Sequence, residues 1–100
     1  MNMEDKVTRL LDIFSITEQQ FIHELHKIIG DSRIKLLLAK DIPKEIGCSP
    51  AVSRATLRLL QVADIVDVDG AGTRGTYITV INRKLFDALA DSIGVKYRKI

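Results

Sequence analysis

Residues 47–64, "GCSPAVSRATLRLLQVAD", limit the possible folds of this 100-residue chain more than any other stretch. Ser49 is a preferred N-cap residue and Pro50 is favoured in a first helical turn, so this pair predicts a helix that begins at Pro50. We expect a shorter helix just upstream, in "AKDIPKEIG" at residues 39–47, ended by its glycine. Three residues, Gly47, Cys48 and Ser49, form the turn between the two helices, which predicts a helix-turn-helix.

Two strand-like segments follow this helix directly. In residues 65–69 and 76–81, apolar and polar side chains alternate with a period of two, which is the period of a β-strand. Between them lie Arg74 and a run of small residues. The pattern predicts a β-hairpin whose tip carries one positive charge and three glycines able to adopt positive φ, namely Gly70, Gly72 and Gly75.

Two amphipathic helices are expected before this motif. The first covers residues 4–14, and its apolar stripe consists of Val7, Leu10, Leu11 and Phe14. For the second helix, we expect Thr17 to be the N-cap and Gln20 to return the capping bond. Ile16 would pack on Phe21 as a hydrophobic staple. Gly30 then ends the helix, because glycine adopts left-handed terminal positions at little cost.

Shorter elements complete the chain. The segment "IKLLLAK" at residues 34–40 is apolar and short, which favours a brief strand. Asn82 is a good N-cap for a last helix over residues 83–93. We expect Gly94 to stop that helix and the basic tail at residues 95–100 to fray.

The order of these elements is typical of a winged helix-turn-helix, a mainly α fold with a small β-hairpin wing (α+β). We divide the chain into a connecting or dimerisation helix at residues 1–16, the winged helix-turn-helix at residues 17–94 and the basic tail at residues 95–100. One hundred residues suffice for one domain with its own core, without a metal or a disulfide.

Composition limits where the protein can be located and what kind of partner it can bind. The single cysteine, Cys48, cannot form an internal disulfide, and residues from Met1 onward show no secretory signal, so we expect a cytoplasmic protein. The longest apolar run is far too short for a membrane span. A net charge of +2 is compatible with a polyanionic partner without proving one.

The helix that starts at Pro50 has one face suited to DNA. On a helical wheel, one side collects the large apolar residues, and the opposite side carries no acidic residue. Short side chains at its start permit close approach to a major groove, and guanidinium groups reach guanine edges or phosphates. This outer face consists of Pro50, Ala51, Arg54, Ala55, Arg58, Gln61 and Val62.

The sequence gives less support to other functions. His23 and His26 have a helical spacing that can bind a metal, but no third ligand accompanies them, so we expect neither a metal nor another cofactor. Cys48 has no base and orienting group to make it a nucleophile, so we expect no enzyme. A winged helix used only for protein contacts remains an alternative, because the outer face is partly apolar at Ala51, Ala55 and Val62.

Residues 36–90 resemble the C-terminal winged helix-turn-helix of the CodY family, transcriptional repressors of low-GC Gram-positive bacteria, and more distantly the DNA-binding domain of GntR-type regulators. "GTRGTYITVIN" at residues 72–82 matches the end of the CodY domain closely, and "VSRATLRLL" at residues 52–60 is similar to its recognition helix. The resemblance implies sequence-specific binding of double-stranded DNA by a homodimer. It also implies that the ligand-sensing domain of the family lies outside these 100 residues.

The resemblance also implies particular contacts. Ala39 and Lys40 would meet phosphates at the start of the first motif helix, and Arg74, Gly75 and Thr76 would form the wing. The residues expected in or beside the major groove are Ser49, Pro50, Ala51, Arg54, Ala55 and Arg58.

Three positions depart from the family pattern. Pro50 and Ala51 stand where a basic and a hydroxylic residue are usual, so hydrogen-bonded base readout is lost there, although Ala51 can still contact a thymine methyl group. Asp64 replaces the usual helix-ending glycine, at some cost to the helix. The helix at residues 4–14 is the expected surface for pairing with a symmetry mate, because a dimer doubles the DNA contacts.

Overall fold

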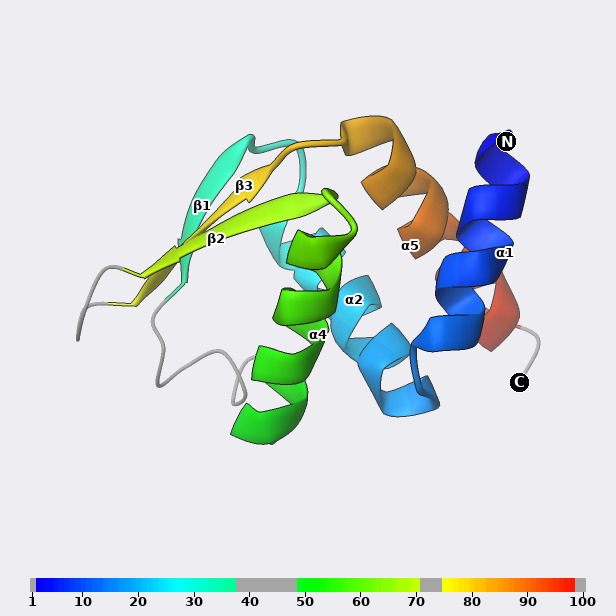
Figure 1. Cartoon of the computed structure of the whole chain (residues 1–100), viewed down its shortest axis with the longest axis horizontal. Helices are drawn as coiled ribbons and strands as arrows, with labels where there is room; N and C mark the ends of the chain where they lie inside the picture. The colour runs from blue at the N-terminus through cyan, green and yellow to red at the C-terminus, as the bar shows by residue number, and fades with distance from the viewer. Residues whose placement is uncertain (1, 38–48, 71–74, 99–100) are drawn as a thin grey trace.

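The computed structural model describes residues 2–37, 49–70 and 75–98. The predicted helix at residues 39–47 and the hairpin tip, with Gly72 and Arg74, lie outside these ranges. The helices gather beside and beneath a small sheet (Figure 1). The elements follow the order α1 (Met3–Ile13), α2 (Ile16–Ile29), β1 (Ile34–Leu37), α4 (Pro50–Val62), β2 (Val66–Gly70), β3 (Thr76–Val80) and α5 (Arg83–Arg98).

The sheet is antiparallel, with the strand order β1-β3-β2. Tyr77 at the centre pairs with Leu36 on one side and with Asp69 on the other. The three predicted strands are therefore confirmed, and the structure adds that β1 joins the hairpin as its third strand. Helices that cover one face of this small sheet make an α+β fold, which confirms the winged helix-turn-helix.

One hydrophobic core joins the helices to the sheet. Its fully buried side chains come from α2, α4, α5 and the inner face of the sheet, so each element contributes its apolar stripe. Helix α5 packs against α2, and α4 packs against both α2 and β2. The largest of these side chains are Phe21, Ile22, Leu25, Leu60, Ile78, Phe86 and Leu89.

Helix α1 uses its apolar stripe inside the chain. Val7 and Phe14 are buried, Leu10 and Leu11 are partly buried against the core, and α1 packs on α5. The stripe from which we predicted a contact with a symmetry mate is thus already covered by the chain itself. Dimerisation through this helix stays a prediction, but the exposed apolar stripe on which we based it is not found.

The prediction for the start of α2 was wrong by two residues. Ser15 is the N-cap: its Oγ accepts a bond from the Glu18 amide, and Glu18 Oε1 accepts a bond from the Ser15 amide. This capping box leaves Thr17 inside the helix, and Gln20 has no capping role. Ile16, 63% exposed, forms no buried staple on Phe21.

The prediction for the end of α5 was also wrong. Asn82 caps the helix as expected, since its Oδ1 accepts a bond from the Leu85 amide at 3.1 Å. The helix then continues through Gly94 to Arg98. Gly94 is buried, and a Cβ there would lie 3.3 Å from Nε2 of His23, so glycine allows α5 to approach α2 closely. The division of the chain at residues 16 and 94 stays a prediction.

Candidate nucleic-acid interface

Both ends of α4 are fixed by local hydrogen bonds. The Ser49 side chain accepts a bond from the Val52 amide at 3.3 Å, and Pro50 occupies the first turn, as predicted. At the other end, the amides of Asp64 and Ile65 donate to the carbonyls of Gln61 and Leu60. This is the pattern of a Schellman motif, in which Asp64 takes the glycine position with φ of 59°.

The two faces of α4 differ as the helical wheel predicted. Ser53, Thr56, Leu57 and Leu60 are buried against the core. The hydroxyl of Thr56 donates to the Val52 carbonyl at 2.7 Å, so this polar group is satisfied although it is buried. The exposed residues are those of the predicted outer face: Pro50, Ala51, Arg54, Ala55, Arg58, Gln61 and Val62.

The outer face of α4 is positively charged and open to a ligand. Arg54 and Arg58 lie one turn apart, and neither has a hydrogen-bond or ion-pair partner among the described residues. The helix contains no acidic residue, and the positive end of its dipole lies at Ser49 beside Ala51. An anion approaching this face therefore meets two guanidinium groups that have no partner among the described residues, on a helix whose N-terminus also attracts negative charge.

The base of the wing lies next to this helix. Strand β2 packs on α4, and Gln61 donates to Oδ1 of Asp67 at 3.4 Å. Gly75 is buried with φ of 137°, a conformation that favours glycine. Gly70, in contrast, lies within β2 without a positive φ, so the expected need for glycine is not found there.

Acidic residues stay on the outer strand of the wing. Asp67 and Asp69 are exposed on β2, which among the described strands pairs only with β3 and is therefore an edge strand.

The structure brings some of the predicted site residues together, and others lie outside the residues that it describes. Ser49, Pro50, Ala51, Arg54, Ala55 and Arg58 share the N-terminal part and the exposed side of α4, while Gly75 and Thr76 stand at the base of the wing. Ala39, Lys40 and Arg74 lie outside the described residues. The contacts predicted for all of them stay predictions.

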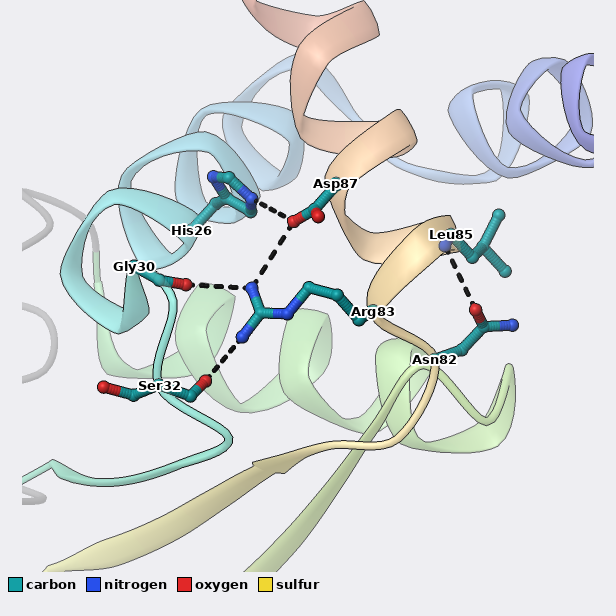
Figure 2. Close-up of polar contacts among 7 residues, drawn as sticks. All are labelled: His26, Gly30, Ser32, Asn82, Arg83, Leu85 and Asp87. Carbon is teal, nitrogen blue, oxygen red and sulfur yellow. Dashed lines mark hydrogen bonds and ion pairs between the residues drawn. The ribbon is translucent and has the colours of Figure 1, made fainter.

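Sequence reasoning missed a polar network between α2 and α5, which Figure 2 shows. His26 Nε2 lies 2.7 Å from Oδ1 of Asp87. Arg83 Nη1 donates to that carboxylate at 3.4 Å and to the Gly30 carbonyl at 2.8 Å, and its Nη2 donates to the Ser32 carbonyl. Apart from Arg83 and Asp87, which both lie on α5, the bonded residues are 61, 53 and 51 positions apart in the chain. No spacing in the sequence could have identified them.

The network also lowers the pKa of the Asp87 side chain. Burial tends to raise the pKa of Asp87, but hydrogen bonds and charges from His26 and Arg83 outweigh it and hold the pKa below its usual value. His26, considered above as a metal ligand, contacts Asp87 and packs on the Phe86 ring in a T-shaped arrangement, with the ring centres 4.9 Å apart. Within the described ranges, no three His, Cys, Asp or Glu side chains are grouped to hold a metal ion.

None of the helices in the described ranges combines the length and apolar composition that crossing a bilayer requires.

Known proteins are similar to this chain in sequence. The family model described as "CodY helix-turn-helix domain" matches residues 35–96. The "Global transcriptional regulator CodY" of Lysinibacillus sphaericus is 31% identical over 85 residues, which are 85% of this chain and 32% of that relative. That of Staphylococcus aureus (strain JH9) is 27% identical over 86 residues, which are 86% of this chain and 33% of the relative. The chain thus spans about a third of the length of these relatives. Since the family model covers more than half of it, the chain belongs to the CodY helix-turn-helix domain family, a family of transcriptional regulators and not of enzymes, as the sequence predicted.

Proposed function

We propose that the chain is the sequence-specific, double-stranded DNA-binding domain of a CodY-like bacterial transcriptional regulator. Helix α4 enters the major groove, and the wing lies on the backbone or in the minor groove. The observation that carries the proposal is the acid-free outer face of α4, where Arg54 and Arg58 are exposed and have no partner among the described residues. Two such groups on one helix face suit base edges and phosphates.

The outer face divides into two parts with different tasks. Ala51 and Ala55 are small and lie towards the N-terminus, so they let the helix approach the bases closely, and Ala51 contacts a thymine methyl group. Arg54 reads a guanine edge with its two parallel donors. Arg58, one turn further along, reaches a base edge or a phosphate.

Backbone contacts position the domain without reading sequence. The wing residues Arg74, Gly75 and Thr76 and the upstream residues Ala39 and Lys40 hold phosphates in this proposal. Its support is the base of the wing, where Gly75 has a φ of 137° that favours glycine and β2 rests on α4. The base of the wing and α4 lie against each other and can therefore act on one DNA duplex.

The relatives extend the proposal to a whole regulator. They are named global transcriptional regulators, and the chain covers about a third of each. We infer that the domain acts as a repressor in the cytoplasm, as a homodimer, together with a ligand-sensing domain. A dimer is required because one domain of this size makes too few contacts for tight, specific binding.

The test is a DNA-binding titration of the wild type and a triple alanine variant of Arg54, Arg58 and Arg74, followed by fluorescence anisotropy. Arg54→Ala alone should cost about 1–3 kcal/mol, or roughly 5- to 150-fold in the dissociation constant, and relax specificity at one base. Arg74→Ala should weaken all sequences alike. Arg9→Ala, which removes an exposed arginine from α1, is the matched control and should change little. Equal affinity of the wild type and the triple variant would end the proposal.

A second function has one observation in its favour. Val62 on the same face is 74% exposed, and with Ala51 and Ala55 it makes the face partly apolar, as in a protein-contact module. The two functions respond differently to salt. Affinity for DNA falls steeply as the salt concentration rises, because counterions compete for the phosphates, whereas an apolar protein interface is nearly insensitive.

A further inference from the structure

A hollow of about 420 Å³ lies where the end of β3 meets the turn before β1 and the start of α5. Its volume falls within the range of small-molecule sites. The proposed contact with DNA does not use it. The fold brings its walls together from two segments far apart in the chain, and the lining residues are Asp31, Arg33, Thr79, Val80, Ile81 and Arg83.

Arg33 supplies the first positive charge of the hollow. Its side chain is exposed, and its guanidinium has no hydrogen-bond or ion-pair partner among the described residues. Its carbonyl accepts a bond from the Val80 amide at 2.8 Å, so the backbone that carries this side chain is fixed against β3. The cation is therefore available to a ligand at a defined place.

Arg83 supplies a second positive charge from the opposite wall. Figure 2 shows its guanidinium held between the carbonyls of Gly30 and Ser32 and the carboxylate of Asp87. These bonds use Nη1 and Nη2, and none of them engages Nε. Asp87 offsets part of the charge, but the side chain is already ordered, so a ligand loses little of its affinity in ordering it.

Two further polar side chains line the hollow. Thr79 is half-buried, and its hydroxyl makes no hydrogen bond within the described part of the chain, so it can donate to a ligand. Asp31 is exposed and forms no ion pair with the described residues. Its carboxylate weakens the attraction for an anion, but two cations outnumber it.

We propose that this hollow binds the phosphoryl group of a small molecule. A tetrahedral oxyanion presents its oxygens in several directions, so it accepts from Arg33 on one side, from Nε of Arg83 on the other and from the Thr79 hydroxyl. A planar carboxylate is matched by a single guanidinium fork and would leave the second cation unused. The inference goes beyond the proposed function and does not depend on it.

The phosphate of a DNA backbone fits the position of the hollow less well. Strand β3 runs from the base of the wing at Thr76 to the start of α5, and the hollow lies at the second of these ends. Figure 1 shows the connection from β3 to α5 on the opposite side of the molecule from the start of α4. A duplex bound along α4 and the wing therefore leaves the hollow free for a separate ligand.

The test is a titration of the isotope-labelled chain with inorganic phosphate, followed by the NMR shifts of its backbone amides. The amides of residues 31–33 and 79–83 should shift and saturate, with a dissociation constant on the order of 1 mM because the contacts are few. Sodium chloride at the same ionic strength is the control and should leave these amides in place, since screening alone does not saturate a site. Shifts at α4 are followed separately.

Four variants assign the binding to these side chains. Arg33→Gln should raise the dissociation constant for phosphate about tenfold, and Thr79→Val should raise it about threefold, because each removes a donor. Arg9→Gln, at an exposed arginine of α1, is the matched control and should change nothing. Asp31→Asn should lower the dissociation constant roughly 2- to 5-fold, because it removes a like charge. A gain in affinity cannot arise from a damaged fold, and circular dichroism checks the other variants.

The outcomes separate this inference from the DNA-binding proposal. Absence of saturable shifts, an Arg33→Gln variant that binds phosphate like the wild type, or weaker binding by Asp31→Asn would each overturn the site. If a short DNA duplex shifted the same amides and Arg33→Gln weakened DNA binding, the bound phosphate would belong to DNA, and the small-molecule site would be wrong. An Arg54→Ala/Arg58→Ala variant should lose DNA affinity and still bind phosphate in the hollow, so either proposal can fail without the other.

Discussion

Arginines in two regions of the molecule are used in opposite ways. Arg83, at the start of α5, donates to the carbonyls of Gly30 and Ser32 and to Asp87, and its guanidinium lies 5.9 Å from the centre of the Phe86 ring. Arg54 and Arg58 on α4 are exposed and have no partner within the described ranges. The arginine of the first region stabilises the fold through its contacts, whereas those of the second region are available to a ligand.

The difference suggests how to distinguish structural from functional charge in a small domain. A structural cation is partly buried, and its donors point at acceptors from distant parts of the chain. A functional cation is held by a rigid helix, whose position is set by apolar packing on its opposite face. If this distinction holds, substitutions in the two regions should separate stability from DNA affinity.

The largest expected effect is on Arg83. Arg83→Met keeps an apolar stem beside Phe86 but leaves the carbonyls of Gly30 and Ser32 without their charged donor, so we expect a loss of about 2–3 kcal/mol in the free energy of unfolding. The measurement is urea unfolding followed by circular dichroism.

Arg58→Met is the matched control for that change. It removes the same charge from an exposed position and should alter stability by less than about 0.5 kcal/mol while lowering DNA affinity. A stability loss of equal size in both variants would erase the distinction between the two regions.

A second prediction concerns the backbone of the wing. Gly75→Ala forces a Cβ onto a residue with φ of 137°, and we expect this strain to cost about 1–3 kcal/mol. Gly70→Ala, on the neighbouring strand, has open space around its Cβ and no positive φ, so it should be neutral or slightly stabilising. Thermal unfolding of both variants provides the measurement. Equal costs would mean that the Gly75 conformation is not required.

Local rules predicted the helix that we propose faces DNA. Ser49 and Pro50 determine the start of α4 in sequence and structure alike, and the spacing of Leu57 and Leu60 determines which side of it is buried. These signals act over one or two helical turns, so they can be read without knowledge of the fold. The exposure of Arg54 follows directly from them.

Tertiary contacts explain what was missed. Gly94 looks like a helix end in isolation, but the close approach of His23 makes a residue without a side chain useful inside α5. Two capping boxes compete at the start of α2, and the one with Ser15 and Glu18 prevails, since a carboxylate is favoured near the positive end of the helix dipole. The bond between His26 and Asp87 joins elements whose proximity only the fold creates.

A third, smaller effect is expected at the end of α4. Asp64 occupies the left-handed position of the Schellman motif, where glycine avoids the Cβ penalty, so Asp64→Gly should stabilise the protein by about 0.5–1 kcal/mol. Asp64→Asn keeps the side-chain size but removes a negative charge from the negative end of the helix dipole, and should gain a few tenths of a kcal/mol. Chemical unfolding of the two variants separates the backbone contribution from the charge. A loss of stability in Asp64→Gly would show that its carboxylate has a stabilising role.

The smallest expected effect is the acid dependence of the network around Arg83. Because contacts with His26 and Arg83 hold the pKa of Asp87 below 3.8, the unfolded chain binds this proton more readily than the folded protein as the pH falls. The stabilisation from Asp87 is therefore fully present only well above the ordinary pKa of 3.8 and is lost as the pH falls through the lowered pKa. Solvent screens a side chain that is 46% exposed, so the loss should be modest. Asp87→Asn should show a flatter decline of unfolding free energy between about pH 4 and 2 than the wild type, and Asp91→Asn, at an exposed position of the same helix, should follow the wild type. If Asp87→Asn and the wild type declined in parallel, the network would hold its arginine by geometry without any contribution from the charge of Asp87.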